Sequence, residues 1–123
     1  MVTLVIIDHH ASIRQALAQR LSRIPDIQVV GTAADGQEGI AQARAHRPDV
    51  VLLEPKLPHG DGLEVLRAIR ADSPASRVIV LTSYLDEFEE QATKKAGAEH
   101  YLLKDIDTTK LAGVILGPDP NVV

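Results

Sequence analysis

Five short apolar runs divide the 123-residue chain, and they constrain its fold more than any other feature. Each run is continuous rather than alternating and rich in β-branched residues, and longer amphipathic stretches separate the runs. Strands of a parallel sheet have this pattern because helices cover both faces of such a sheet. The runs are Leu4 to Ile7, Ile27 to Ala33, Val50 to Leu53, Val78 to Leu81 and Tyr101 to Leu103. The sequence therefore predicts a doubly wound α/β fold around five parallel strands.

The stretches between the runs have the apolar spacing of helices that pack one face against a sheet. Apolar residues at helical spacing within 13–21 and within 40–45 indicate the first two helices. The remaining three are expected from near Gly62 to before Pro74, over about 86–96 with closure at Gly97, and from Thr108 to Leu116 behind an Asp107 N-cap. Strands and helices thus alternate along the chain.

The length is that of a single domain, which we expect to span residues 1–117. Pro118 and Pro120 interrupt any helix there, so 118–123 is predicted to be a tail or the start of a linker. The opening apolar run is too short for a signal peptide or a membrane span and reads as a strand. We expect a cytoplasmic protein that does not contact a membrane.

Charge and aromatic content argue against a nucleic-acid-binding surface. The net charge is -4 with a pI near 5.7, whereas affinity for phosphates needs clustered Lys and Arg. The three aromatic residues Tyr84, Phe88 and Tyr101 are too few for a base-stacking platform. Any DNA contact is therefore expected from another segment or protein.

Four of the five predicted strands end in a polar residue: Asp8, Glu54, Thr82 and Lys104. The carboxyl ends of parallel strands meet at one edge of the sheet, where ligands of such folds bind. Two carboxylates suit Mg²⁺, and a hydroxyl with a lysine suits a phosphoryl group. The residues therefore predict a site that handles phosphoryl groups.

Four segments in this order resemble the signatures of response-regulator receiver domains: VIIDHHASIRQAL, PDVVLLEPKLPHGDGLEVL, RVIVLTSY and GAEHYLLKD. The resemblance covers about residues 2 to 116 and implies the flavodoxin-like strand order 2-1-3-4-5, for which the receiver fold is itself a standard example. It places Pro58, Asp61 and Gly62 in the loop after the third strand.

The same resemblance implies roles for individual residues. Asp8 matches one of the two acids that hold Mg²⁺, and Lys56 matches the position whose backbone carbonyl completes the metal site. Thr82 matches the hydroxyl that moves to the phosphoryl group, and Lys104 matches the lysine that binds it. Tyr101 matches the aromatic residue whose inward rotation accompanies activation.

Two departures from the family pattern fall on the chemistry itself. His9 replaces the second metal-binding acid, and Glu54 replaces the phosphate-accepting aspartate. Imidazole is a poor ligand for Mg²⁺, so we expect a weak Mg²⁺ site formed by Asp8, Glu54 and Lys56. Glu54 is longer than Asp by one bond of about 1.5 Å. It is predicted to accept no stable phosphoryl group and to pair with Lys104 instead.

The resemblance implies a two-component signalling module rather than an enzyme. Its expected partners are a cognate histidine kinase, if phosphorylation is retained, and an attached or separate output domain that controls transcription. A homodimer through the fourth helix, fifth strand and fifth helix is a further expectation. The alternative is a Mg-dependent phosphatase or a flavin carrier of the same fold class. A phosphatase needs an aspartyl nucleophile, and residues 8–12 contain no glycine to hold a cofactor phosphate.

His9 and His10, with His59, are candidate ligands of a transition metal. Adjacent residues at a strand end are expected to point in different directions, and the chain contains no cysteine. Both arguments disfavour such a site. The acidic residues Asp86, Glu87, Glu89 and Glu90 at the start of the fourth predicted helix are interpreted as partners of its dipole.

Overall fold

The computed structural model describes residues 1–58 and 62–117 and contains strands and helices in strict alternation. The elements are β1 (Val2–Ile7), α1 (Ala11–Ser22), β2 (Ile27–Ala33), α2 (Gly36–His46), β3 (Val50–Leu53), α3 (Gly62–Asp72), β4 (Arg77–Thr82), α4 (Glu87–Lys95), β5 (His100–Leu103) and α5 (Thr108–Leu116). The predicted linker at 118–123 and the residues His59 and Asp61 lie outside the described residues.

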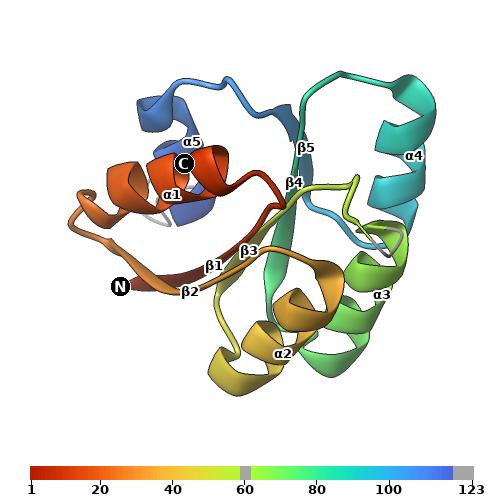
Figure 1. The fold of residues 1–123 in the computed structure, drawn as a ribbon, viewed down its shortest axis with the longest axis horizontal. Coiled ribbons are helices and arrows are strands. Elements are labelled where there is room, and N and C mark those ends of the chain that lie inside the picture. Colours follow the sequence, from red (N-terminus) through yellow and green to blue (C-terminus); the bar gives the residue numbers. More distant parts are fainter. Residues whose placement is uncertain (59–61, 118–123) are drawn as a thin grey trace, which may run out of the picture.

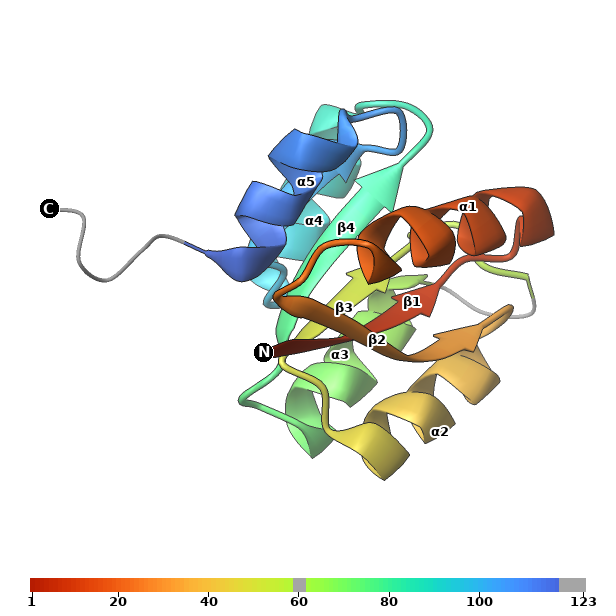
Figure 2. The same cartoon turned by 90° about the vertical axis from the view of Figure 1, so that its left-hand side faces the viewer.

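The five strands form one parallel sheet in the order β2-β1-β3-β4-β5, which confirms the predicted topology. Helices α1 and α5 cover one face of this sheet, and α2, α3 and α4 cover the other (Figures 1 and 2). In the described part of the chain, no helix combines the length and the apolar character that crossing a bilayer requires.

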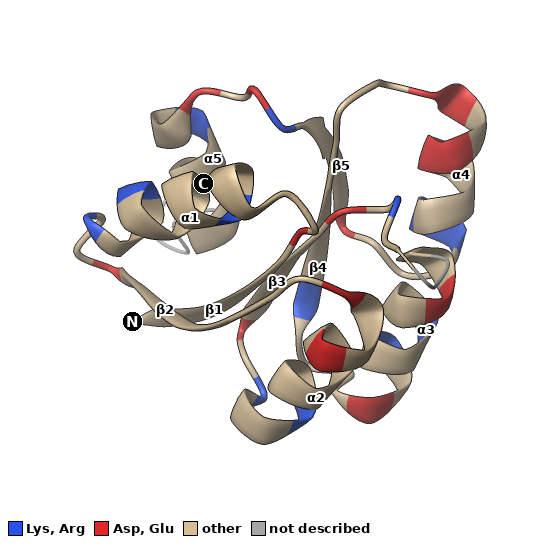
Figure 3. Ribbon diagram, in the orientation of Figure 1, with Lys and Arg blue, Asp and Glu red and all other residues tan. Residues whose placement is uncertain are grey.

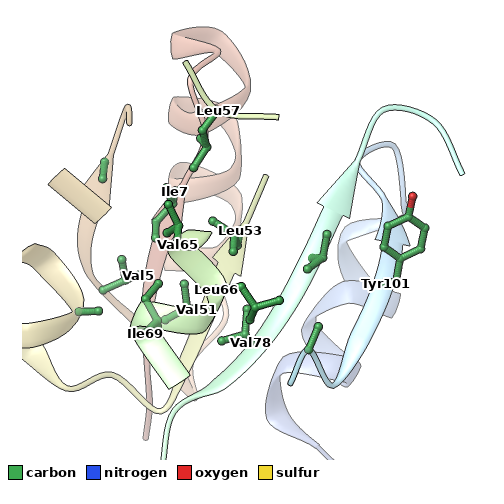
Figure 4. Packing of buried hydrophobic residues seen from close by; sticks show 14 residues of the cluster. Val5, Ile7, Val51, Leu53, Leu57, Val65, Leu66, Ile69, Val78 and Tyr101 are labelled. Carbon is green, nitrogen blue, oxygen red and sulfur yellow. The ribbon is translucent and has the colours of Figure 1, made fainter. Parts of the chain in front are cut away.

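Alternate residues of each strand enter different hydrophobic clusters. On β1, Val5 and Ile7 pack with α3 residues Leu66 and Ile69 (Figure 4), whereas the neighbouring Leu4 packs toward α1 and α5. All five side chains are at most 1% exposed. The continuous apolar runs of the sequence exist because both faces of the sheet are buried.

Two glycines fix the chain where other residues would be strained. Gly62 donates its N–H to the Pro55 carbonyl, and a Cβ at Gly62 would lie only 2.2 Å from that oxygen. Gly97 follows α4 with a φ of 110°, which a side chain rarely tolerates. The first contact holds the start of α3 close to the end of β3, where the polar residues gather.

Candidate functional site

Asp8 and Glu54 lie side by side because β1 and β3 are neighbours in register. Ile7 pairs with Leu53, so the next residue of each strand leaves the sheet at the same edge. The pairing of β1 with β3 continues past Leu53, because the Glu54 N–H donates to the Ile7 carbonyl at 3.0 Å. The Asp8 and Glu54 residues are 3% and 4% exposed, so two carboxylates are buried next to each other.

Lys104, which follows β5, supplies the positive charge between them. Its Nζ lies 2.6 Å from Glu54 Oε1 and 2.9 Å from Asp8 Oδ2, and its side chain is 7% exposed. The Lys104 N–H donates to the Thr82 carbonyl at 2.8 Å, which anchors the residue against the end of β4. The predicted pairing of Glu54 with Lys104 is therefore present.

The ionisation of Glu54 reflects opposing effects. Burial raises its pKa, but hydrogen bonds from the Lys104 ammonium, from the His9 backbone N–H and from the His9 side chain outweigh burial. The net result is a pKa below the usual value for a glutamate. Glu54 is thus a carboxylate near neutral pH, as its ion pair with Lys104 requires.

The two histidines after β1 lie against this pair of acids. The His9 N–H donates to Glu54 Oε2 at 2.9 Å, and the His10 N–H donates to Asp8 Oδ1 at 2.8 Å. Their rings contact each other, with centroids 3.8 Å apart. His9 Nδ1 contacts Glu54 Oε2, and His10 Nδ1 lies 3.3 Å from Asp8 Oδ1. The expectation that the two side chains point apart is wrong, because the turn into α1 brings both rings onto the carboxylates.

Thr82 and Tyr101 meet at a carboxylate that the sequence reasoning missed. The Thr82 hydroxyl lies 3.2 Å from Glu89 Oε1, and the Tyr101 hydroxyl donates to the same oxygen at 2.7 Å. The Thr82 hydroxyl also donates to the Tyr84 carbonyl at 2.9 Å. Tyr101 is 6% exposed, and the pKa of its hydroxyl is raised first by burial and then by Glu89. Thr82 is thus held by the start of α4.

Glu89 is the third residue of α4, behind the Asp86 N-cap, where a glutamate commonly reaches back to the N-cap N–H. Here the Tyr101 hydroxyl accepts the Asp86 N–H at 3.1 Å, and Glu89 is left to bind Thr82 and Tyr101. Acidic residues gather in the first turn of this helix (Figure 3). The sequence signal that could have singled out Glu89 is its capping-box spacing from Asp86.

A pocket of about 140 Å³ lies beside the carboxylates and is lined by residues 9–10, 54–56 and 82–84. Thr82 and Lys56 therefore border the same space as Glu54. The Lys56 ammonium lies 5.8 Å from the centroid of the Tyr84 ring. The pocket is small, and its size suits an ion or a small anion rather than a cofactor.

The residues at this edge fit a divalent cation. Ligand atoms of Asp8, His9, His10 and Glu54 all lie within 4.8 Å of one another. Asp8 and Glu54 supply the oxygen ligands that Mg²⁺ prefers, whereas His9 supplies nitrogen, and the Lys104 ammonium competes for both acids. Mg²⁺ would accordingly bind weakly at this site, where it would neutralise negative charge on a phosphoryl group.

Comparison with known proteins agrees with this geometry. The sequence model of the response regulator receiver domain matches residues 4–116. The chain is 36% identical over 115 residues to the transcriptional regulatory protein LiaR of Bacillus subtilis, covering 94% of this chain and 54% of that protein. It is 38% identical over 109 residues to the nitrate/nitrite response regulator protein NarL of Escherichia coli K12, covering 89% and 50%.

The chain thus spans about half the length of these relatives. Its fold matches the solved signal receiver domain of the response regulator NarL from Mycobacterium tuberculosis with a TM-score of 0.88 and 31% identity, covering 94% of this chain and 93% of that one. The sequence match and the strand order agree, although His9 and Glu54 depart from the family pattern, and the chain belongs to the family of response-regulator receiver domains.

Proposed function

We propose that this chain is a receiver module whose signalling does not use a phosphoryl group on Glu54. The observation that carries the proposal is the ion pair of Glu54 with Lys104 at 2.6 Å. Glu54 occupies the position of the phosphate-accepting aspartate, and Lys104 occupies that of the phosphoryl-binding lysine. The lysine is therefore engaged by a negative charge before any phosphoryl group arrives.

Two further features oppose phosphoryl transfer. In-line transfer loses rate steeply when the reacting group is displaced by about 1 Å, and the extra bond of Glu54 is longer than that. The Thr82 hydroxyl, which the family pattern assigns to the phosphoryl group, donates to the Tyr84 carbonyl and lies 3.2 Å from Glu89. The acceptor, the lysine and the hydroxyl are thus all arranged for a state without phosphate.

The output of such a module is a change in its surface rather than turnover of a substrate. Candidate contact residues are exposed before and within the first turn of α4, where Tyr84, Leu85 and Phe88 are 73%, 63% and 85% exposed. We place the output contact, and a homodimer where one forms, on α4, β5 and α5. The relatives are about twice as long and include a DNA-binding transcriptional activator, which favours a DNA-binding regulator of which this module is one part. A cytoplasmic location and a histidine kinase partner belong to the same proposal.

Intact-mass measurement after incubation with a small-molecule phosphodonor and Mg²⁺ tests the proposal. The wild type should gain no phosphoryl mass, Glu54→Asp should gain one, and Glu54→Asp with His9→Asp should gain it to a greater extent. Glu64→Asp makes the same chemical change on the exposed face of α3 and should behave as the wild type. Stable labelling of wild-type Glu54 would refute the proposal. Hydrolysis of a generic phosphate ester by the wild type would instead favour the phosphatase alternative.

A further inference from the structure

The first turn after β1 presents two imidazole rings to two buried carboxylates. His10 Nδ1 lies 3.3 Å from Asp8 Oδ1 and 3.5 Å from Glu54 Oε1, and His9 Nδ1 contacts Glu54 Oε2. Both turn residues are held by their backbone as well, since their N–H groups donate to the same two carboxylates. Arg14 adds a hydrogen bond from Nη1 to the Asp8 carbonyl at 2.8 Å. Asp8, His9 and His10 therefore reach Glu54, which follows β3, from a turn that several hydrogen bonds hold in place.

The two spacings from His10 Nδ1 match those between ligands around one ion. Ligand atoms about 2.0–2.2 Å from a tetrahedral zinc ion lie about 3.3–3.6 Å from one another. The two distances from His10 Nδ1 fall in that range, and all four ligand atoms lie within 4.8 Å of one another. The imidazole side chains are 35% and 44% exposed while both carboxylates are 4% exposed, so an ion can enter from the histidine side.

The ligand types select the class of metal. Two nitrogens and two carboxylates suit Zn²⁺, Co²⁺ or Ni²⁺, whereas Mg²⁺ requires oxygen ligands in octahedral geometry. The cluster of Asp8, His9, His10 and Glu54 already attracts a cation. The Lys104 ammonium contacts both acids and lies 3.3 Å from His10 Nδ1. With neutral histidines, the two carboxylates and one ammonium leave one net negative charge at the cluster.

We propose that Asp8, His9, His10 and Glu54 form a binding site for a divalent transition-metal ion, with Zn²⁺ preferred over Mg²⁺. The ion binds in competition with the Lys104 ammonium for Asp8 and Glu54. Occupancy therefore frees Lys104, the residue after β5, and the site couples a metal ion to the segment that leads into α5. This inference is independent of phosphorylation, since it concerns metal binding to the isolated chain without a phosphodonor.

Calorimetric titration of the metal-free full chain with Zn²⁺, and separately with Mg²⁺, measures the affinity of the site for each ion. We expect one Zn²⁺ per chain, and loss of a ligand in His9→Ala or in His10→Ala should weaken Zn²⁺ binding by at least about 10-fold. His9→Asp should weaken Zn²⁺ and strengthen Mg²⁺, which reverses the preference. Lys104→Met should bind Zn²⁺ more tightly because the competing ammonium is absent.

Two matched variants control for surface histidines. His46→Ala removes an exposed histidine of α2. His100→Ala removes a histidine of β5 whose Nε2 lies 3.3 Å from Glu99 Oε1, a pair of surface groups that could bind a metal ion nonspecifically. Both should retain wild-type Zn²⁺ affinity. Co²⁺ bound to the wild type should give the visible spectrum of a low-coordinate ion with nitrogen ligands, a readout that needs no variant to fold. Equal affinity for Zn²⁺ and Mg²⁺, or loss of Zn²⁺ binding only in His100→Ala, would overturn the proposal.

Discussion

Replacing Lys104 with methionine removes the ammonium that lies between two buried carboxylates. At 2.6 and 2.9 Å, each contact is worth about 6 kcal/mol at an effective dielectric of 20, before desolvation is subtracted. Desolvation of the three groups cancels much of this gain, so the net contribution of the intact cluster is small. The variant is different because it keeps the desolvation penalty of Asp8 and Glu54 and loses the attraction.

Removing one partner of a buried ion pair typically destabilises a protein by about 3–5 kcal/mol, and we expect a loss of that size for Lys104→Met. Domains of this kind have a total stability of about 5–15 kcal/mol, so the effect is easy to measure. Urea unfolding followed by circular dichroism at pH 7, with EDTA to exclude stray metal ions, gives the free energy of unfolding.

Lys110→Met makes the same change at an exposed position of α5 and should shift the free energy of unfolding by less than about 0.5 kcal/mol. Adding Glu54→Gln to Lys104→Met removes one of the two unpaired charges and should recover part of the loss. A Lys104→Met penalty under about 1 kcal/mol, equal to that of a solvated surface pair, would refute the buried-cluster reasoning.

Two further predictions concern other ion pairs and hydrogen bonds. Arg77 lowers the pKa of Glu99, so this contact stabilises the fold above the ordinary glutamate pKa and is lost as pH falls through the lowered value. The difference in free energy of unfolding between wild type and Arg77→Met should therefore become smaller below about pH 4. If acid unfolding curves show the same difference at all pH values, the contact between Arg77 and Glu99 does not have this role. Glu89→Gln should lower the Tyr101 pKa toward its usual value, measured by tyrosinate absorbance with Tyr84→Phe as background; no change would contradict the contact.

The sequence predicted most of the scaffold because its signals there are local. The runs at 27–33 and 50–53 coincide with β2 and β3. All four residues of β3 are buried, whereas β2 lies at the edge of the sheet and is buried mainly at its two ends. The fifth helix was predicted with its observed bounds, because Asp107 caps its first turn and Gly117 ends it with a φ of 75°. Strand ends elsewhere differ by one or two residues, where pairing continues past the apolar run.

The sequence predicted only those parts of the site whose positions follow from the register of the parallel strands. Asp8, Glu54 and Lys104 meet because neighbouring parallel strands end at one edge, as expected. The orientation of His9 was missed, since it depends on backbone angles of the turn into α1 rather than on residue type. Glu89 was missed because its partner Tyr101 lies on another element, twelve residues further along the chain. Such contacts depend on tertiary packing and produce no periodic pattern in the amino-acid sequence.

Amide NMR spectra recorded before and after addition of a phosphodonor with Mg²⁺ test the central claim most directly. In the wild type, we expect no shift of the signals from α4, β5 and α5, because Glu54 already pairs with Lys104 and accepts no phosphoryl group. In Glu54→Asp with His9→Asp, signals from these elements should move when the phosphodonor is added. Phosphodonor-dependent shifts of the same signals in the wild type, equal to those of the double variant, would contradict the account.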